Sequence, residues 1–101
     1  MLAIDVRTAV DQAVVYLKSI QDLIGNAGTE IEDLRLEEVE LSEDKKSWLI
    51  TLGFDIPVKN RSPIEAIMAS PIASPKYQRE YRLFKVNTET GEVESMKIRK
   101  V

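Results

Sequence analysis

Carboxylates are the main side chains in this sequence that could do chemistry. The chain contains no histidine and no cysteine, which removes the commonest general base, thiolate nucleophiles and zinc–cysteine sites. The spacing of the acidic residues matches neither an EF-hand loop nor another ordered set of metal ligands. We therefore predict no catalytic residue, no metal site and no cofactor, and we interpret the acidic cluster as a solvated face. The cluster comprises Glu30, Glu32, Asp33, Glu37, Glu38 and Glu40.

Basic and aromatic side chains near the C-terminus could in principle bind nucleic acid, because cations can follow a phosphate backbone while rings stack on bases. The whole chain nevertheless carries a net charge of −3, and it contains no nucleic-acid-binding motif. We do not expect a nucleic-acid partner. The residues concerned are Arg79, Arg82, Lys85, Lys97, Arg99 and Lys100, with Tyr77, Tyr81 and Phe84.

The length of 101 residues predicts a single domain that spans residues 1–101, with one two-layer core. Hydrophobic residues make up 44% of the chain and charged residues 31%, as in ordinary globular proteins. No apolar run approaches the roughly 20 residues that a membrane span needs, and no secretion signal is visible. We expect a cytoplasmic protein without membrane contact.

The charges are divided unevenly along the chain. Residues 1–44 contain 11 acidic and 3 basic residues, whereas residues 45–101 contain 6 acidic and 11 basic ones. One interpretation, which we favour, is that acidic and basic strands lie side by side in one sheet. The other is a basic surface for an acidic partner.

The N-terminal segment Asp5–Ile24 has the apolar spacing of an amphipathic helix. Its apolar residues recur at steps of three and four, and Asp5 can cap the free N–H groups of the first turn. Gly25-Asn26 offers the left-handed residue at which helices often end. The rest of the chain must supply the surface that this helix covers.

Four later segments alternate apolar and polar residues with the period of a β-strand: Asp33–Ser42, Ser47–Ile56, Tyr77–Val86 and Glu92–Lys100. The apolar phase slips by one residue at Glu37-Glu38 and again after Val93. Each slip predicts a β-bulge, which keeps the apolar side chains on one face. Gly91 suits the positive φ of a short β-turn.

The segment Pro57–Lys76 interrupts this pattern and contains all four prolines. It is predicted to be a loop or to include a short helix, because Ser62-Pro63-Ile64-Glu65 has the spacing of a capping box. Its apolar residues Ile64, Ile67 and Met68 either pack on the domain's own sheet or belong to a mobile lid or partner-binding segment.

These elements predict an α+β fold, in which one long N-terminal helix packs on a four-stranded antiparallel sheet. If Phe84 and Trp48 face the helix, then Leu49, Tyr81 and Leu83 face away and leave the outer side of the sheet partly apolar. Either Pro57–Lys76 or a second copy of the chain would cover that side. The predicted interaction surface comprises Leu49, Tyr81, Leu83, Ile64, Ile67 and Met68.

The run Arg82–Val93, with Val86-Asn87 and then Thr90-Gly91-Glu92-Val93, resembles the closing hairpin of PepSY-like domains. The order helix, strand, strand, loop, strand, strand is compatible with that family. The resemblance implies a non-enzymatic binding module, often linked to peptidases as an inhibitor or propeptide. We expect a small binding or regulatory module that acts through protein–protein contact, as a homodimer. The alternative is a ligand carrier or enzyme with a pocket between helix and sheet, roofed by Pro57–Lys76.

Overall fold

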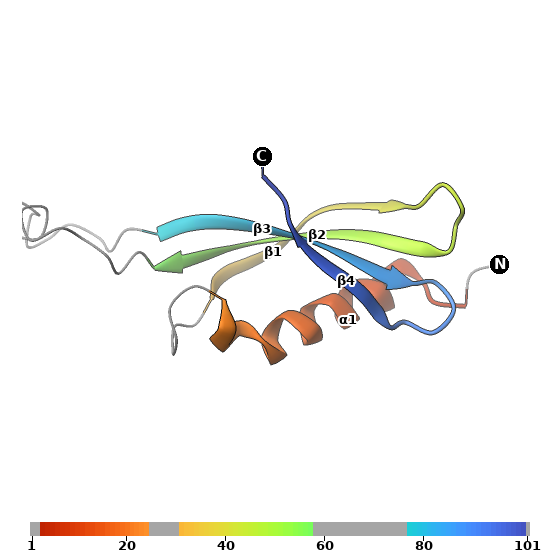
Figure 1. Cartoon of the computed structure of the whole chain (residues 1–101), viewed down its shortest axis with the longest axis horizontal. Coiled ribbons are helices and arrows are strands. Elements are labelled where there is room, and N and C mark those ends of the chain that lie inside the picture. Colours follow the sequence, from red (N-terminus) through yellow and green to blue (C-terminus); the bar gives the residue numbers. More distant parts are fainter. Residues whose placement is uncertain (1–2, 25–30, 58–76, 101) are drawn as a thin grey trace, which may run out of the picture.

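The computed structural model describes residues 3–24, 31–57 and 77–100. It has an α+β fold, with one α-helix packed on one face of an open antiparallel sheet whose strand order is β1-β2-β3-β4 (Figure 1). This architecture confirms the fold class predicted from the sequence. In chain order, the elements are α1 (Val6–Ser19), a 3-10 turn η1 (Gln21–Leu23), β1 (Glu32–Leu41), β2 (Ser47–Pro57), β3 (Tyr77–Asn87) and β4 (Val93–Ile98).

The helix begins where the sequence predicts but is shorter than predicted. The Asp5 carboxylate accepts a hydrogen bond from the Thr8 N–H at 2.8 Å, which caps the first turn. The α-helix ends at Ser19, whose hydroxyl donates to the Tyr16 carbonyl at 2.6 Å. A single 3-10 turn then follows, so the prediction of a helix that continues to Ile24 was wrong. The predicted stop at Gly25-Asn26 lies outside the described residues.

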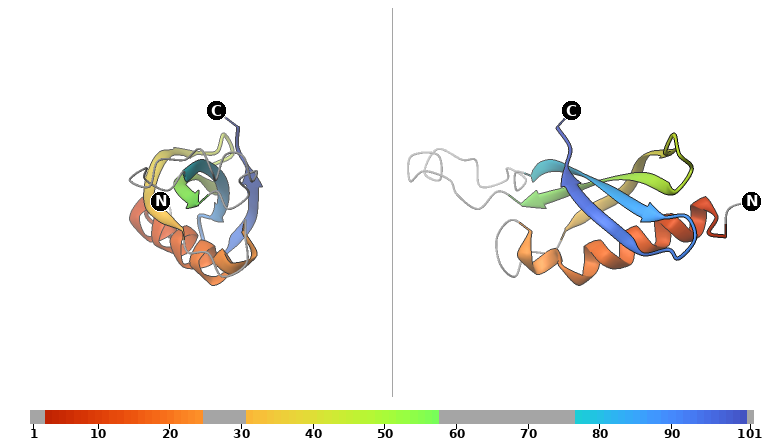
Figure 2. Two further views of the ribbon diagram at one scale, coloured as in Figure 1. Left: turned by 90° about the vertical axis from the view of Figure 1, so that its left-hand side faces the viewer. Right: turned by 45° about the vertical axis from the view of Figure 1, so that its right-hand side comes forward.

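The core lies between α1 and the sheet. Ala9, Ala13 and Leu17, spaced four residues apart, form the buried stripe of the helix. They face fully buried side chains of β2 and β3, and Figure 2 shows the helix lying along one face of the twisted sheet. Those strand residues are Ile50, Leu52, Phe54, Phe84 and Val86, on the face that the alternation predicts.

Trp48 lies at the edge of this core. It is half-buried, and its indole N–H donates to the Ile4 carbonyl at 2.9 Å. The bond satisfies the one polar group of the side chain and ties the segment before α1 to β2. This placement agrees with the prediction that Trp48 faces the helix.

Both predicted bulges are present. The pairs Leu36–Leu52 and Glu38–Thr51 leave Glu37 as an extra residue in β1, and a second register shift occurs where β3 meets Glu94 of β4. A further irregularity in β1 follows Glu32, where Asp33 has φ 49°. Gly91 has φ 77°, as predicted for the turn before β4.

The helix lies over β2, β3 and β4 rather than over the first strand. β1 is an edge strand of the sheet, and α1 covers its helix-facing side chains only in part. None of the helices in the described ranges is long and apolar enough to cross a membrane.

Candidate functional site

An apolar groove runs between α1 and the edge strand β1. It encloses about 310 Å³ and is lined mainly by aliphatic side chains. Val6 is 38% exposed, Leu36 47% and Val39 38%, which makes this the place where two apolar strand residues and one apolar helix residue meet solvent together. The lining residues of this α1–β1 groove are Val6, Arg7, Val10, Asp11, Leu36 and Val39.

The bulge at Glu37 explains why two strand residues share the groove. Leu36 and Val39 are three residues apart, so in a regular strand they would point to opposite faces. The extra residue returns Val39 to the helix side of the sheet, opposite Ile50. The bulge that the phase slip predicts therefore places both Leu36 and Val39 in the groove.

The opposite face of the sheet, which we call the outer face, is crossed by an arginine of β3. The Arg79 guanidinium lies 2.7 Å from a Glu37 carboxylate oxygen, 3.2 Å from Asp55 and 3.3 Å from Asp33. It also donates to the Asp33 carbonyl at 2.8 Å. Arg79 therefore reaches over β2 and anchors the irregular start of β1.

Glycine at position 53 leaves the space that this contact needs. A Cβ atom there would lie 2.8 Å from Glu37 Cγ and 3.0 Å from an Arg79 guanidinium nitrogen, closer than packed carbon atoms tolerate. The Glu37–Arg79 pair passes directly over the Gly53 backbone. A glycine in a strand interior otherwise weakens the strand, so close approach of side chains accounts for it.

Gly53→Val is expected to lower the free energy of unfolding by about 1–3 kcal/mol, although valine is the better strand former. Urea unfolding measures the loss. In the Glu37→Ala background the clash is reduced and the same substitution should cost clearly less. An equal cost in both backgrounds would contradict this account of Gly53.

A second arginine crosses the outer face from beyond β4. Arg99 donates to Glu38 of β1 at 2.8 Å and to the Thr51 hydroxyl of β2 at 2.8 Å. The hydrogen bond from Arg99 and its positive charge lower the pKa of Glu38. In the sheet, the acidic strand β1 pairs with β2, and Arg79 and Arg99 of the basic C-terminal hairpin reach it across the sheet. The favoured interpretation of the charge pattern expected acidic and basic strands to lie side by side, but β2 separates β1 from the basic hairpin of β3 and β4.

The structure places the predicted interaction residues of the sheet on this outer face. Leu49, Tyr81 and Leu83 are half-buried there, and the Arg99 N–H donates to the Tyr81 carbonyl at 3.0 Å. The other three predicted residues, Ile64, Ile67 and Met68, lie outside the described residues.

Sequence reasoning missed the three groove residues Val6, Leu36 and Val39. It assigned all of them to the core, because their periodicity matches that of residues that are buried. The sequence did indicate that some apolar residues would stay exposed, because one helix cannot cover the inner face of four strands. Periodicity does not tell which strand remains uncovered.

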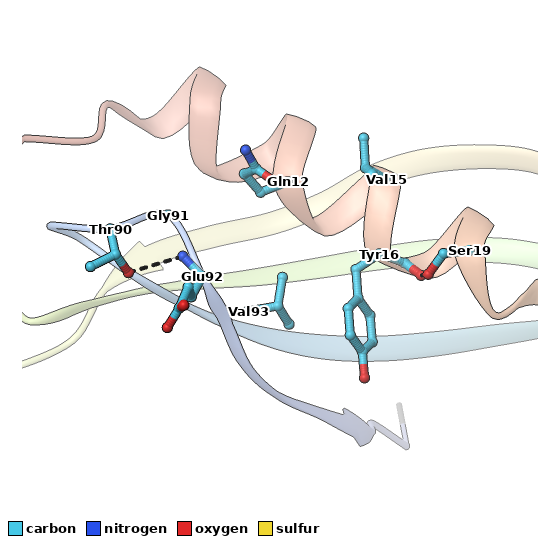
Figure 3. Close-up of a pocket in the computed structure, with 8 residues that line it drawn as sticks. All are labelled: Gln12, Val15, Tyr16, Ser19, Thr90, Gly91, Glu92 and Val93. Atoms are coloured by element: carbon cyan, nitrogen blue, oxygen red, sulfur yellow. Dashed lines mark hydrogen bonds between the residues drawn. The ribbon is translucent and has the colours of Figure 1, made fainter.

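A second hollow, of about 520 Å³, lies on the other side of α1, next to the turn before β4. Figure 3 shows Tyr16 extending from α1 past Val93 of β4. The Tyr16 ring packs edge-on against Phe84 at 6.1 Å. Of the hydroxyls here, Ser19 bonds to its own helix and Thr90 accepts from the Glu92 N–H at 3.2 Å. Ser19 and Thr90 are thus engaged within the protein.

Within residues 3–24, 31–57 and 77–100, no group of three or more acidic side chains is arranged to hold a metal ion. In comparisons with known proteins, no family model, curated protein or solved structure matches this chain.

Proposed function

We propose that the protein is a small non-enzymatic binding module that acts through protein–protein contact at the α1–β1 groove. Its occupant is an extended segment of another protein that lies along β1. The observation that carries the proposal is the exposure of Leu36 and Val39, next to Val6, on a strand at the edge of the sheet. A cytoplasmic location and a relationship to PepSY-like domains remain part of the proposal, the latter supported by the order of one helix and four antiparallel strands.

An extended segment suits the groove because it can satisfy two needs at once. β1 has a neighbour on one side only within the described residues, so part of its backbone N–H and C=O groups point outward. A segment that pairs with this edge would place every second side chain over Leu36 and Val39. Apolar side chains at those positions would cover the exposed groove.

A second copy of the chain fits this edge poorly. In a twofold antiparallel pairing centred on Val39, Glu38 of each copy would face Glu40 of the other. Like charges directly opposite each other destabilise a strand pair. The homodimer through Leu49, Tyr81 and Leu83 stays a prediction. Such an interface would carry an energetic cost, because the charged pairs of the outer face would lose their contact with water.

A carrier or enzyme with a pocket between helix and sheet receives less support. The inner positions are occupied by fully buried side chains such as Leu17, Phe54 and Phe84. A charged residue beside them is the buried Arg82, which lies over the Phe54 ring at 5.6 Å and donates to the Tyr81 carbonyl at 3.1 Å. Arg82 is therefore engaged within the protein.

A capped hexapeptide of alternating threonine and valine tests the proposal, with binding measured by titration calorimetry. We expect measurable binding and a loss of about tenfold in Val39→Asn, because burial of one valine side chain is worth about 1.5–3 kcal/mol. The matched control is Val15→Asn, which alters an exposed valine on the other side of α1 and should leave affinity unchanged. Equal effects of the two substitutions, or a wild-type dimer in sedimentation that excludes the peptide, would contradict the proposal.

A further inference from the structure

The acidic side chains of the edge strand β1 also indicate which charge its occupant should have. We infer that the α1–β1 groove takes segments in which basic residues alternate with apolar ones, an inference that rests on the proposed function and names the chemistry of the partner. It follows from which β1 side chains lie on each face and from how their charges are already used.

β1 is regular only over Glu38–Leu41, between the bulge at Glu37 and the turn that begins at Ser42. In this stretch Val39 and Leu41 belong to the helix side of the sheet, opposite Ile50 and Trp48. Glu38 and Glu40 belong to the outer face. A strand added to this edge therefore meets acid, apolar, acid and apolar side chains in turn, whichever direction it runs.

The two glutamates are not equally neutralised. Glu38 already binds Arg99, yet its side chain remains 52% exposed. Glu40 is exposed and forms no ion pair with any residue in the described ranges. Its neighbour across the strand pair is Leu49 of β2, which offers no charge. The charge of Arg99 acts on Glu40 only from a distance, since the guanidinium binds Glu38. The free side of the edge is thus where a cation would meet Glu40.

The groove on the helix side of β1 has no comparable excess of one charge among the described residues. Among the described residues, the charged ones that line it are Arg7 and Asp11, which are of opposite sign and one helical turn apart on α1. The other described lining residues are aliphatic. An occupant that is basic on the outer face and apolar in the groove therefore matches both sides of β1.

The test compares two capped hexapeptides at low and physiological salt, one of alternating lysine and valine and one of alternating glutamate and valine. At low salt we expect the lysine peptide to bind at least about tenfold more tightly, because Glu38 and Glu40 each favour lysine over glutamate by about threefold or more across the strand pair. The preference should shrink as salt is raised. Equal affinities at low salt would overturn the inference.

Charge reversal locates the effect. Glu40→Lys should weaken the lysine peptide and strengthen the glutamate peptide, each about threefold or more. The matched control is Glu89→Lys, on the exposed turn before β4, which changes the net charge equally and should leave the preference intact. If both glutamate substitutions act alike, the preference reflects net charge and the inference fails.

The failure of the inference can be told apart from the failure of the proposed function. If both peptides bind equally and Val39→Asn weakens both, the groove binds segments without selecting charge. If neither peptide binds, or if Val39→Asn affects neither, the groove is not the binding surface and both proposals are overturned.

Discussion

Leu17→Ala is expected to lower the free energy of unfolding by about 2–5 kcal/mol. Leu17 is fully buried at the centre of the stripe by which α1 contacts the sheet. Removing its three distal carbon atoms leaves a cavity between two layers that are held by other side chains. For a domain whose total stability is about 5–15 kcal/mol, this is a large fraction.

Urea unfolding followed by circular dichroism measures the loss, with Val15→Ala as the control. Val15 is on the same helix but 64% exposed, so its truncation should change stability by less than about 0.5 kcal/mol. Similar losses in the two variants would mean that a second surface covers the far side of α1, as in a larger assembly.

Phe84→Ala should be about as costly, at about 3–5 kcal/mol. The Phe84 ring is fully buried in β3, opposite Ile50, and meets the Tyr16 ring edge-on with an angle of 77° between the ring planes. It therefore joins the helix to the centre of the sheet. Loss of the ring removes apolar burial and the aromatic contact together.

Phe84→Leu provides a milder variant if the alanine variant does not fold. Leucine fills most of the space and should recover more than half of the lost stability, measured by the same urea titration. If Phe84→Ala costs less than about 1 kcal/mol, the packing of α1 on β3 described here is wrong.

Local sequence signals predicted the elements well wherever one residue decides the geometry. The phase slip at Glu37-Glu38 has one solution that keeps apolar residues on one face, which is a bulge. Gly91 occupies a position of positive φ that other residues rarely adopt, and Asp5 is a strong cap. In each case the cause lies within a few residues of its effect.

The end of α1 and the ion pairs of the outer face could not be predicted in this way. The apolar periodicity continues to Ile24 although the α-helix ends at Ser19, because a 3-10 turn can carry the same apolar residues. Arg79 and Glu37 are 42 residues apart, and their contact depends on Gly53 of a third strand. Such contacts follow from sheet order and register, which alternation alone does not specify.

The α1–β1 groove belongs to the second group. Leu36 and Val39 have the pattern of core residues, and they are exposed only because α1 lies over β2, β3 and β4. The position of a helix over a sheet depends on packing across the whole interface. Apolar residues of the core and of a docking surface are therefore alike in sequence and differ in what covers them.

Amide hydrogen exchange of the edge strand, with and without the lysine–valine hexapeptide, tests the central claim most directly. In the free protein, outward-pointing amides of Glu38–Leu41 should exchange rapidly, since they have no partner strand within the described residues. Bound peptide should slow these amides at least about tenfold while the amides of the opposite edge, β4, remain unchanged. Protection at both edges alike, or peptide binding without protection of Glu38–Leu41, would contradict the assignment of this groove as the binding surface.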